Sequence, residues 1–267
     1  MQKYIISSDG LNLIAEEMGQ GLPLVFAHGL IGTRHNTLEQ LAPLASHYRV
    51  VAFDQRGHGD STPVTSSSQL DPMRMAEDFG AVMSGMNMQQ AIVGGESMGA
   101  ATALLFALHH PEQVDALLLT APAFGDRPNS EREQIEQMGE AIIQMGMEAF
   151  LAQAAEHQRN KLGWPEEAIN AVARNFRRHQ PESVALACRT VPSWVILEDF
   201  APLQAFDRPV CLIAWPGDNL HPLDLAQRMA STFPHSKLAV LNSVTEIFSQ
   251  PRHVGEIYLD FLSELAR

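Results

Sequence analysis

The stretch "AIVGGESMGAATALLFALHH", residues 91–110, decides the fold because a short apolar run passes directly into a helical pattern. Between the two lies GESMG (residues 95–99), which matches G-x-S-x-G. A strand-to-helix turn this sharp strains the backbone of the serine and requires small neighbours. The pattern predicts that Ser97 is a nucleophile raised above a sheet edge, at a helix N-terminus that favours a developing oxyanion. The alternative is a glycine-rich turn with an incidental serine.

Short apolar runs rich in β-branched residues recur along the whole chain, at Pro23–Gly29, Tyr48–Asp54, Gln90–Glu96, Val114–Pro122, Pro209–Trp215 and Lys237–Asn242. Such runs are typical of strands buried between two helix layers. Helical patterns alternate with them, at Thr37–Ser46, Asp71–Met86, Met98–His110, Pro222–Thr232 and Pro251–Leu265. The alternation predicts an α/β protein with a mostly parallel, doubly wound sheet. The alternating stretch Lys3–Glu17 is broken by SSDG (residues 7–10), a turn signal that indicates two antiparallel strands, one on each side of it.

The composition disfavours several classes of partner. The 267 residues carry 31 acidic and 18 basic side chains, a net charge of −13, which disfavours binding to nucleic acid or an anionic membrane. No apolar run approaches the roughly 20 residues of a membrane span, and no signal peptide is indicated. The two cysteines, Cys188 and Cys211, lack metal-ligand spacing. We expect a cytoplasmic monomer or homodimer that acts on a small molecule and needs no metal or other cofactor.

Two further motifs carry a family resemblance. "VFAHGLIGT" (residues 25–33) and "VAFDQRGHGDS" (residues 51–61) occur with GESMG in the order and spacing of the α/β-hydrolase fold superfamily, which the chain resembles over nearly its full length. The VFAHGLIGT motif resembles the HG-x oxyanion loop of that superfamily. The VAFDQRGHGDS motif is similar to the D-x-R-G-x-G-x-S signature common among its esterases, enol-lactonases and cofactor-free haloperoxidases. The resemblance implies helices on both faces of the sheet and a helical lid.

The expected lid is the block that breaks the alternation of strands and helices. Residues 127–205 contain several helix-like segments without a convincing buried strand, so we expect a lid inserted after the sixth strand. The core would then comprise residues 1–126 and 206–267. Apolar lid residues such as Trp194 either line a substrate pocket or pack on the sheet. Arg34 and His35, just past the oxyanion loop, are further candidate substrate contacts.

The resemblance also implies an oxyanion hole made by the backbone N–H groups of Leu30 and Met98. Met98 follows the nucleophile, and Leu30 follows a strand that should end beside it. His28 and His58 are expected to have structural roles, in loops that brace the top of the sheet.

The acid and the base are less regular. Asp218 follows a buried strand, where the superfamily carries its acid, although PGDN (residues 216–219) is also typical of a turn. The superfamily usually carries its histidine in a Gly-His loop before the last helix, and here Val244 stands at that position.

His221 is the candidate replacement because it lies in the loop over the carboxyl ends of the strands and keeps the order Ser…Asp…His. Its GDxxHP context and the shortened final loop resemble a subset of the superfamily that lacks the usual C-terminal Gly-His. The runners-up are His253 as base and Asp126 as acid.

These residues predict a serine hydrolase of the α/β-hydrolase fold acting on an ester, lactone or thioester of a small to medium, partly apolar molecule. A non-hydrolytic or catalytically impaired ligand-binding protein is the first alternative. Acyl transfer or carbon–carbon bond cleavage in the same pocket is the other alternative.

Overall fold

Eight strands form one sheet in the order β1-β2-β4-β3-β5-β6-β7-β8. They are β1 (Gln2–Ser8), β2 (Leu11–Met18), β3 (Leu22–Ala27), β4 (Tyr48–Asp54), β5 (Ala91–Glu96), β6 (Val114–Thr120), β7 (Val210–Ala214) and β8 (Ser236–Val240). The pairs β1–β2 and β2–β4 are antiparallel, and all later pairs are parallel. The computed structural model describes residues 2–265, so residue 1 and residues 266–267 of the expected core lie outside the described part.

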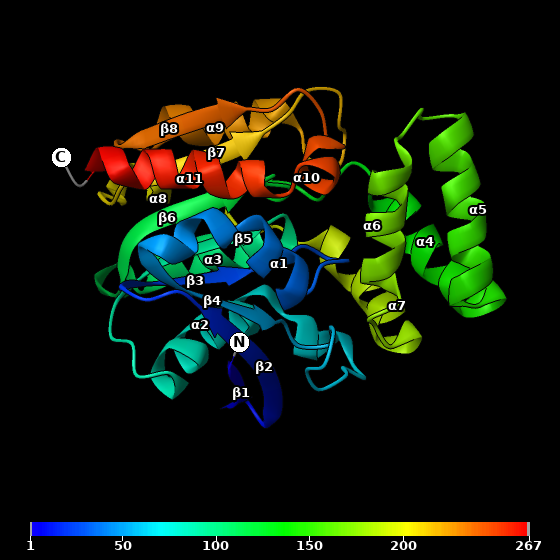
Figure 1. Cartoon of the computed structure of the whole chain (residues 1–267), viewed down its shortest axis with the longest axis horizontal. Helices are drawn as coiled ribbons and strands as arrows, with labels where there is room; N and C mark the ends of the chain where they lie inside the picture. Colours follow the sequence, from blue (N-terminus) through cyan, green and yellow to red (C-terminus); the bar gives the residue numbers. More distant parts are fainter. Residues whose placement is uncertain (1, 266–267) are drawn as a thin grey trace.

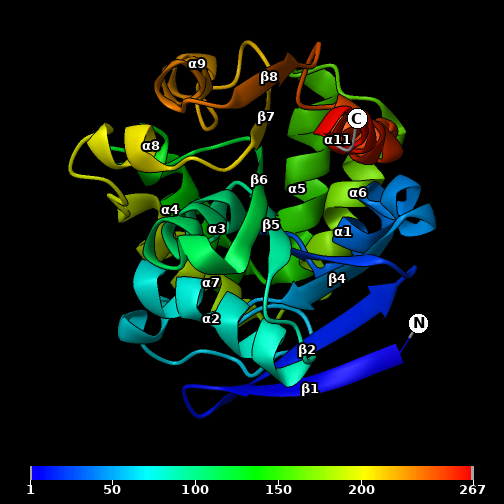
Figure 2. The same cartoon turned by 90° about the vertical axis from the view of Figure 1, so that its left-hand side faces the viewer.

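Helices cover both faces of the sheet (Figure 2). One face carries α1 (Arg34–Gln40) and α11 (Arg252–Leu265), and the other carries α2 (Pro72–Gly85), α3 (Met98–His109) and α9 (Leu223–Thr232). Side chains alternate along each strand, so Val25 packs on the α2–α3 side and Phe26 on the α1–α11 side. Because both faces are buried, the strands read as continuous apolar runs, and the predicted doubly wound sheet is confirmed.

Five helices lie between β6 and β7: α4 (Arg132–Met145), α5 (Met147–Asn160), α6 (Glu166–Phe176), α7 (Pro181–Thr190) and α8 (Ala201–Ala205). Helices α4 to α7 pack together beyond one end of the sheet (Figure 1). They enclose an apolar cluster of their own that includes Ile142, Phe176 and Cys188. The segment after α7, which leads back to β7, packs on the sheet instead. Its residues Trp194 and Leu203 belong to the large apolar cluster there.

The remaining elements are short. They are the 3-10 helices η1 (Ala42–Ser46), η2 (Ser67–Leu70), η3 (Pro111–Gln113) and η4 (Val191–Ser193), and the helix α10 (Glu246–Ser249). The single helix expected at residues 37–46 is divided into α1 and η1, with Pro43 in the first turn of the latter piece, where a missing N–H is tolerated. No helix within residues 2–265 is long and apolar enough to cross a membrane.

Candidate active site

Ser97 occupies a sharp turn between β5 and α3. Its φ of 53° and ψ of −108° are strained for a residue with a side chain. A carbon added at Gly95 would lie 2.1 Å from the carbonyl of Gly99, and one added at Gly99 would lie 2.2 Å from the carbonyl oxygen of Ala27. The two glycines of GESMG are therefore required because strands β3 and β5 and helix α3 meet here without room for side chains.

The structure brings Ser97, His221 and Asp218 into one hydrogen-bonded chain. The Ser97 Oγ lies 2.9 Å from His221 Nε2, and His221 Nδ1 lies 2.8 Å from Asp218 Oδ2. The loop between β7 and α9 makes this possible, because Asp218 Oδ1 accepts the backbone N–H groups of Leu220 (2.9 Å) and His221 (3.3 Å). This local turn folds the histidine back over its neighbouring carboxylate. The three side chains thus have the geometry that nucleophilic catalysis by a serine needs.

Trp215 is a second hydrogen-bond partner of the Asp218 carboxylate, besides His221. This fully buried indole donates from Nε1 to Asp218 Oδ2 over 2.7 Å. Burial alone would raise the pKa of Asp218, but hydrogen bonds with His221 and Trp215 lower it to about 2. The carboxylate is therefore ionised near neutral pH and favours a proton on Nδ1 of the ring, which leaves Nε2 free to accept from Ser97.

The loop after β3 runs beside the nucleophile. A carbon added at Gly29 would lie 3.4 Å from Ser97 Cβ. Leu30, the next residue, therefore begins a stretch of the loop that lies close to Ser97. Met98 is the first residue of α3, where an N–H has no acceptor inside the helix. His28 braces the loop: its Nδ1 lies 2.7 Å from the Gly29 carbonyl oxygen, and its Nε2 accepts the Gln55 N–H at 3.0 Å.

The runner-up residues have other partners. Nδ1 of His253 lies 2.8 Å from a Glu246 carboxylate oxygen. Asp126 accepts from Arg228 Nη2 at 2.8 Å. Val244, at the position where a histidine is usual, packs against the apolar cluster on the α1–α11 face. The hydrogen bond to Ser97 comes from His221 alone among these candidates.

Arg34 has a structural role in place of the expected substrate contact. Its side chain is buried, and its guanidinium donates to Asp54, to Glu16 at 2.9 Å and to Asp60 at 2.8 Å. Three carboxylates from β2, β4 and the following loop thus compensate one buried cation. The side chain faces this network, so the assignment to substrate contact is corrected.

Trp194 is likewise a packing residue. It is buried, its Nε1 donates to the Leu70 carbonyl oxygen at 3.2 Å, and its ring packs on Phe124 with centroids 5.6 Å apart. His35, the third candidate substrate contact, lines a cavity between α1 and α6.

Glu96, which precedes Ser97, and its partner Gln40 were not singled out by the sequence pattern. Gln40 Nε2 donates to Glu96 Oε2 at 3.1 Å, and Glu96 Oε1 is 3.4 Å from the point where a carbon on Gly29 would stand. Burial raises the pKa of Glu96, while the Gln40 hydrogen bond and the charge of His221 oppose that rise. An acidic residue next to the serine, in a strand that is otherwise apolar, is the signal that could have identified this group.

Helices α4 to α7 supply an apolar wall next to the candidate catalytic residues. Leu30 and Ile31 of the VFAHGLIGT motif, and Leu220 beside His221, pack against the apolar cluster of these helices. Aromatic and sulfur-containing lid side chains belong to the same contact region, among them Phe150, Trp164, Met138 and Met147. The arrangement favours a substrate with an apolar part.

Comparison with known proteins identifies a family. Residues 23–244 match the family model described as alpha/beta hydrolase fold. The AB hydrolase superfamily protein YisY of Bacillus subtilis is 35% identical over 134 residues, which cover 48% of this chain and 49% of that protein. A putative carbamate hydrolase, RutD, of Agrobacterium fabrum is 26% identical over 228 residues, covering 82% and 84%.

The structural comparison agrees with the sequence comparison. A thermophilic esterase of Thermogutta terrifontis, solved with malate bound, has a TM-score of 0.81 at 23% identity, covering 99% of both chains. This likeness shows the fold. The chain spans about half or less of the length of the curated relatives that it first matches.

Proposed function

Because the chain belongs to the alpha/beta hydrolase fold family, we propose that it is a serine hydrolase for an ester, lactone or thioester of a small to medium, partly apolar molecule. The observation that carries this proposal is the 2.9 Å contact between Ser97 Oγ and His221 Nε2, with Asp218 behind the ring. The relative named as a putative carbamate hydrolase supports a carbonyl substrate.

In the proposed reaction His221 takes the proton of Ser97 as the oxygen attacks the substrate carbonyl. The backbone N–H groups of Leu30 and Met98 donate to the oxyanion, and Asp218 stabilises the imidazolium. His221 then returns the proton to the leaving group. A water molecule, activated by the same histidine, releases the acid from the acyl-enzyme.

Other features of the chain suit a partly apolar substrate and a reducing compartment. The apolar wall formed with the lid favours an apolar acyl or alcohol part. Cys188 and Cys211 are free and buried, as expected in a reducing compartment such as the cytoplasm. We retain the proposal of a monomer or homodimer.

The test is ester hydrolysis by the purified protein. p-Nitrophenyl esters from acetate to octanoate are offered to the wild type, to Ser97→Ala and to a control, Ser231→Ala, in which an exposed serine is lost. We expect Ser97→Ala to lower kcat/KM by at least about 10³-fold and the control to leave it unchanged. Equal rates for wild type and Ser97→Ala would reject the proposal and favour the ligand-binding alternative.

A further inference from the structure

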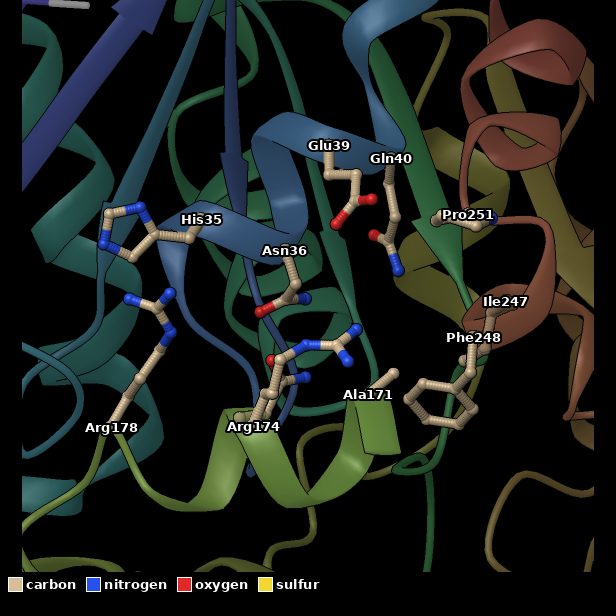
Figure 3. Close-up of a pocket in the computed structure, with 11 residues that line it drawn as sticks. His35, Asn36, Glu39, Gln40, Ala171, Arg174, Arg178, Ile247, Phe248 and Pro251 are labelled. Atoms are coloured by element: carbon tan, nitrogen blue, oxygen red, sulfur yellow. The ribbon is translucent and has the colours of Figure 1, made fainter. Parts of the chain in front are cut away.

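A polar cavity lies between the lid and the core, away from the apolar wall. Its volume is about 110 Å³, and residues of α1, of α6 with the turn after it, and of α10 line it. Figure 3 shows side chains entering from both sides, with Glu39 and Gln40 on α1 and Arg174 and Arg178 opposite. Phe248 of α10 forms part of an apolar end wall.

Two exposed arginines, neither of them in an ion pair within the described part of the chain, bring positive charge to this cavity. Among residues 2–265 no carboxylate lies within ion-pair distance of Arg174 or Arg178, whereas the adjacent Arg177 is paired with Glu148 at 2.8 Å. This contrast stands out in a chain of net charge −13, in which most of the other arginines find an acidic partner. In Figure 3 the Arg178 guanidinium extends toward His35. Burial lowers the pKa of His35, and the positive charges of Arg34 and Arg178 lower it further. The electrostatic potential at this side of the cavity is therefore positive.

The side chain of Gln40 connects the cavity to the residue that precedes Ser97. Gln40 lines it and donates to Glu96, the residue that precedes Ser97. Glu39 also lines the cavity and reduces its net positive charge, which disfavours a phosphate dianion. A single carboxylate suits two guanidinium groups, because each can donate two parallel hydrogen bonds. The volume holds a carboxylate with a few methylene groups against Phe248.

We propose that this cavity binds a free carboxylate at the far end of the acyl part, so that the preferred substrates are hemiesters of short dicarboxylic acids. The proposal rests on the proposed hydrolase function. It goes further because it assigns a second anchoring point and a charge to the substrate.

The test compares monoethyl glutarate with ethyl 5-methylhexanoate, in which an isopropyl group replaces the carboxylate. We expect wild type to prefer the glutarate ester by roughly tenfold or more in kcat/KM. Arg174→Gln and Arg178→Gln should remove this preference, mainly by raising KM, while leaving turnover of the neutral ester within about twofold. The matched control is Arg177→Gln, which removes a neighbouring arginine that is already paired and should retain the preference.

A binding measurement separates this proposal from the proposed function. Calorimetric titration of Ser97→Ala with glutarate should show binding that is lost in the double variants Ser97→Ala/Arg174→Gln and Ser97→Ala/Arg178→Gln. Glutarate binding without any ester turnover would uphold the anion site and reject the hydrolase. Hydrolysis of the neutral ester, with no glutarate preference and no glutarate binding, would overturn the inference while the hydrolase stands.

Discussion

The Asp218 carboxylate lies 2.8 Å from Nδ1 of His221, although the two residues are only three positions apart in the sequence. The loop achieves this because the other carboxylate oxygen accepts the backbone N–H groups of Leu220 and His221. Acid and candidate base therefore come from one turn after β7. The later loop around Val244 packs against the core.

Asp218→Asn should lower kcat/KM by about 10²- to 10⁴-fold, because an amide neither stabilises the imidazolium nor fixes the ring tautomer. The pKa of Asp218 is about 2, so the carboxylate remains ionised and the loss should be similar at pH 6 and at pH 9. Asp126→Asn is the control, since Asp126 is paired with Arg228. A large loss in the control and none in Asp218→Asn would transfer the role of acid to Asp126.

Glu96→Gln should shift the acidic limb of the kcat/KM–pH profile to lower pH. The substitution keeps the shape and the Gln40 hydrogen bond but removes a negative charge that interacts with His221. Removing a negative charge makes protonation of the site less favourable, so activity should persist further into the acid range. Rates measured between pH 4 and pH 9 test this, and an unmoved limb would show that Glu96 is only a packing residue.

Gly99→Ala should destabilise the fold by about 3 kcal/mol or more, since the added carbon would overlap the backbone of Ala27. Gly80→Ala is the control. Its added carbon would lie 3.4 Å from the Phe106 ring, and alanine favours the helix α2, so we expect a change within about 1 kcal/mol. Denaturant unfolding measures both, and equal stabilities would contradict the close packing inferred at the elbow.

The fold was predictable because its signals are local. Apolar runs and helical patterns indicated the strands and helices to within a few residues, and the glycines around Ser97 indicated the turn where β5 meets α3. The roles of other residues depend on distant partners. Arg34 is neutralised by carboxylates far away in the sequence, and Gln40 reaches Glu96 from a different element. Such pairings depend on tertiary packing, which residue type and spacing do not encode.

Three buried histidines join the turn between α6 and α7 to the core and should make stability depend on pH. The ring centroids of His28 and His58 are 5.2 Å apart, and those of His58 and His179 are 5.3 Å apart. His179 lies with Nε2 3.1 Å from the Ile31 carbonyl oxygen and accepts the Gly59 N–H at Nδ1, over 3.2 Å. Protonation of Nδ1 would break the bond from Gly59.

Burial, followed by the charge of His58, lowers the pKa of His179 to about 3. The unfolded chain binds a proton below about pH 6.5, whereas the folded chain does so only near pH 3. Stability should therefore fall between these values as pH decreases, by about 1.4 kcal/mol per pH unit for this residue. His179→Gln should reduce that slope between pH 6.5 and pH 5. An identical slope for wild type and variant in denaturant titrations would contradict a neutral, buried His179.

The most direct test is whether His221 activates Ser97. A fluorophosphonate is added to wild type, His221→Ala, His253→Ala and Ser97→Ala, and adduct formation is followed by intact mass. We predict rapid labelling of wild type and His253→Ala, no adduct in Ser97→Ala, and labelling at least about 10²-fold slower in His221→Ala. Labelling of His221→Ala at the wild-type rate would contradict this prediction, because the serine would then be activated by another group.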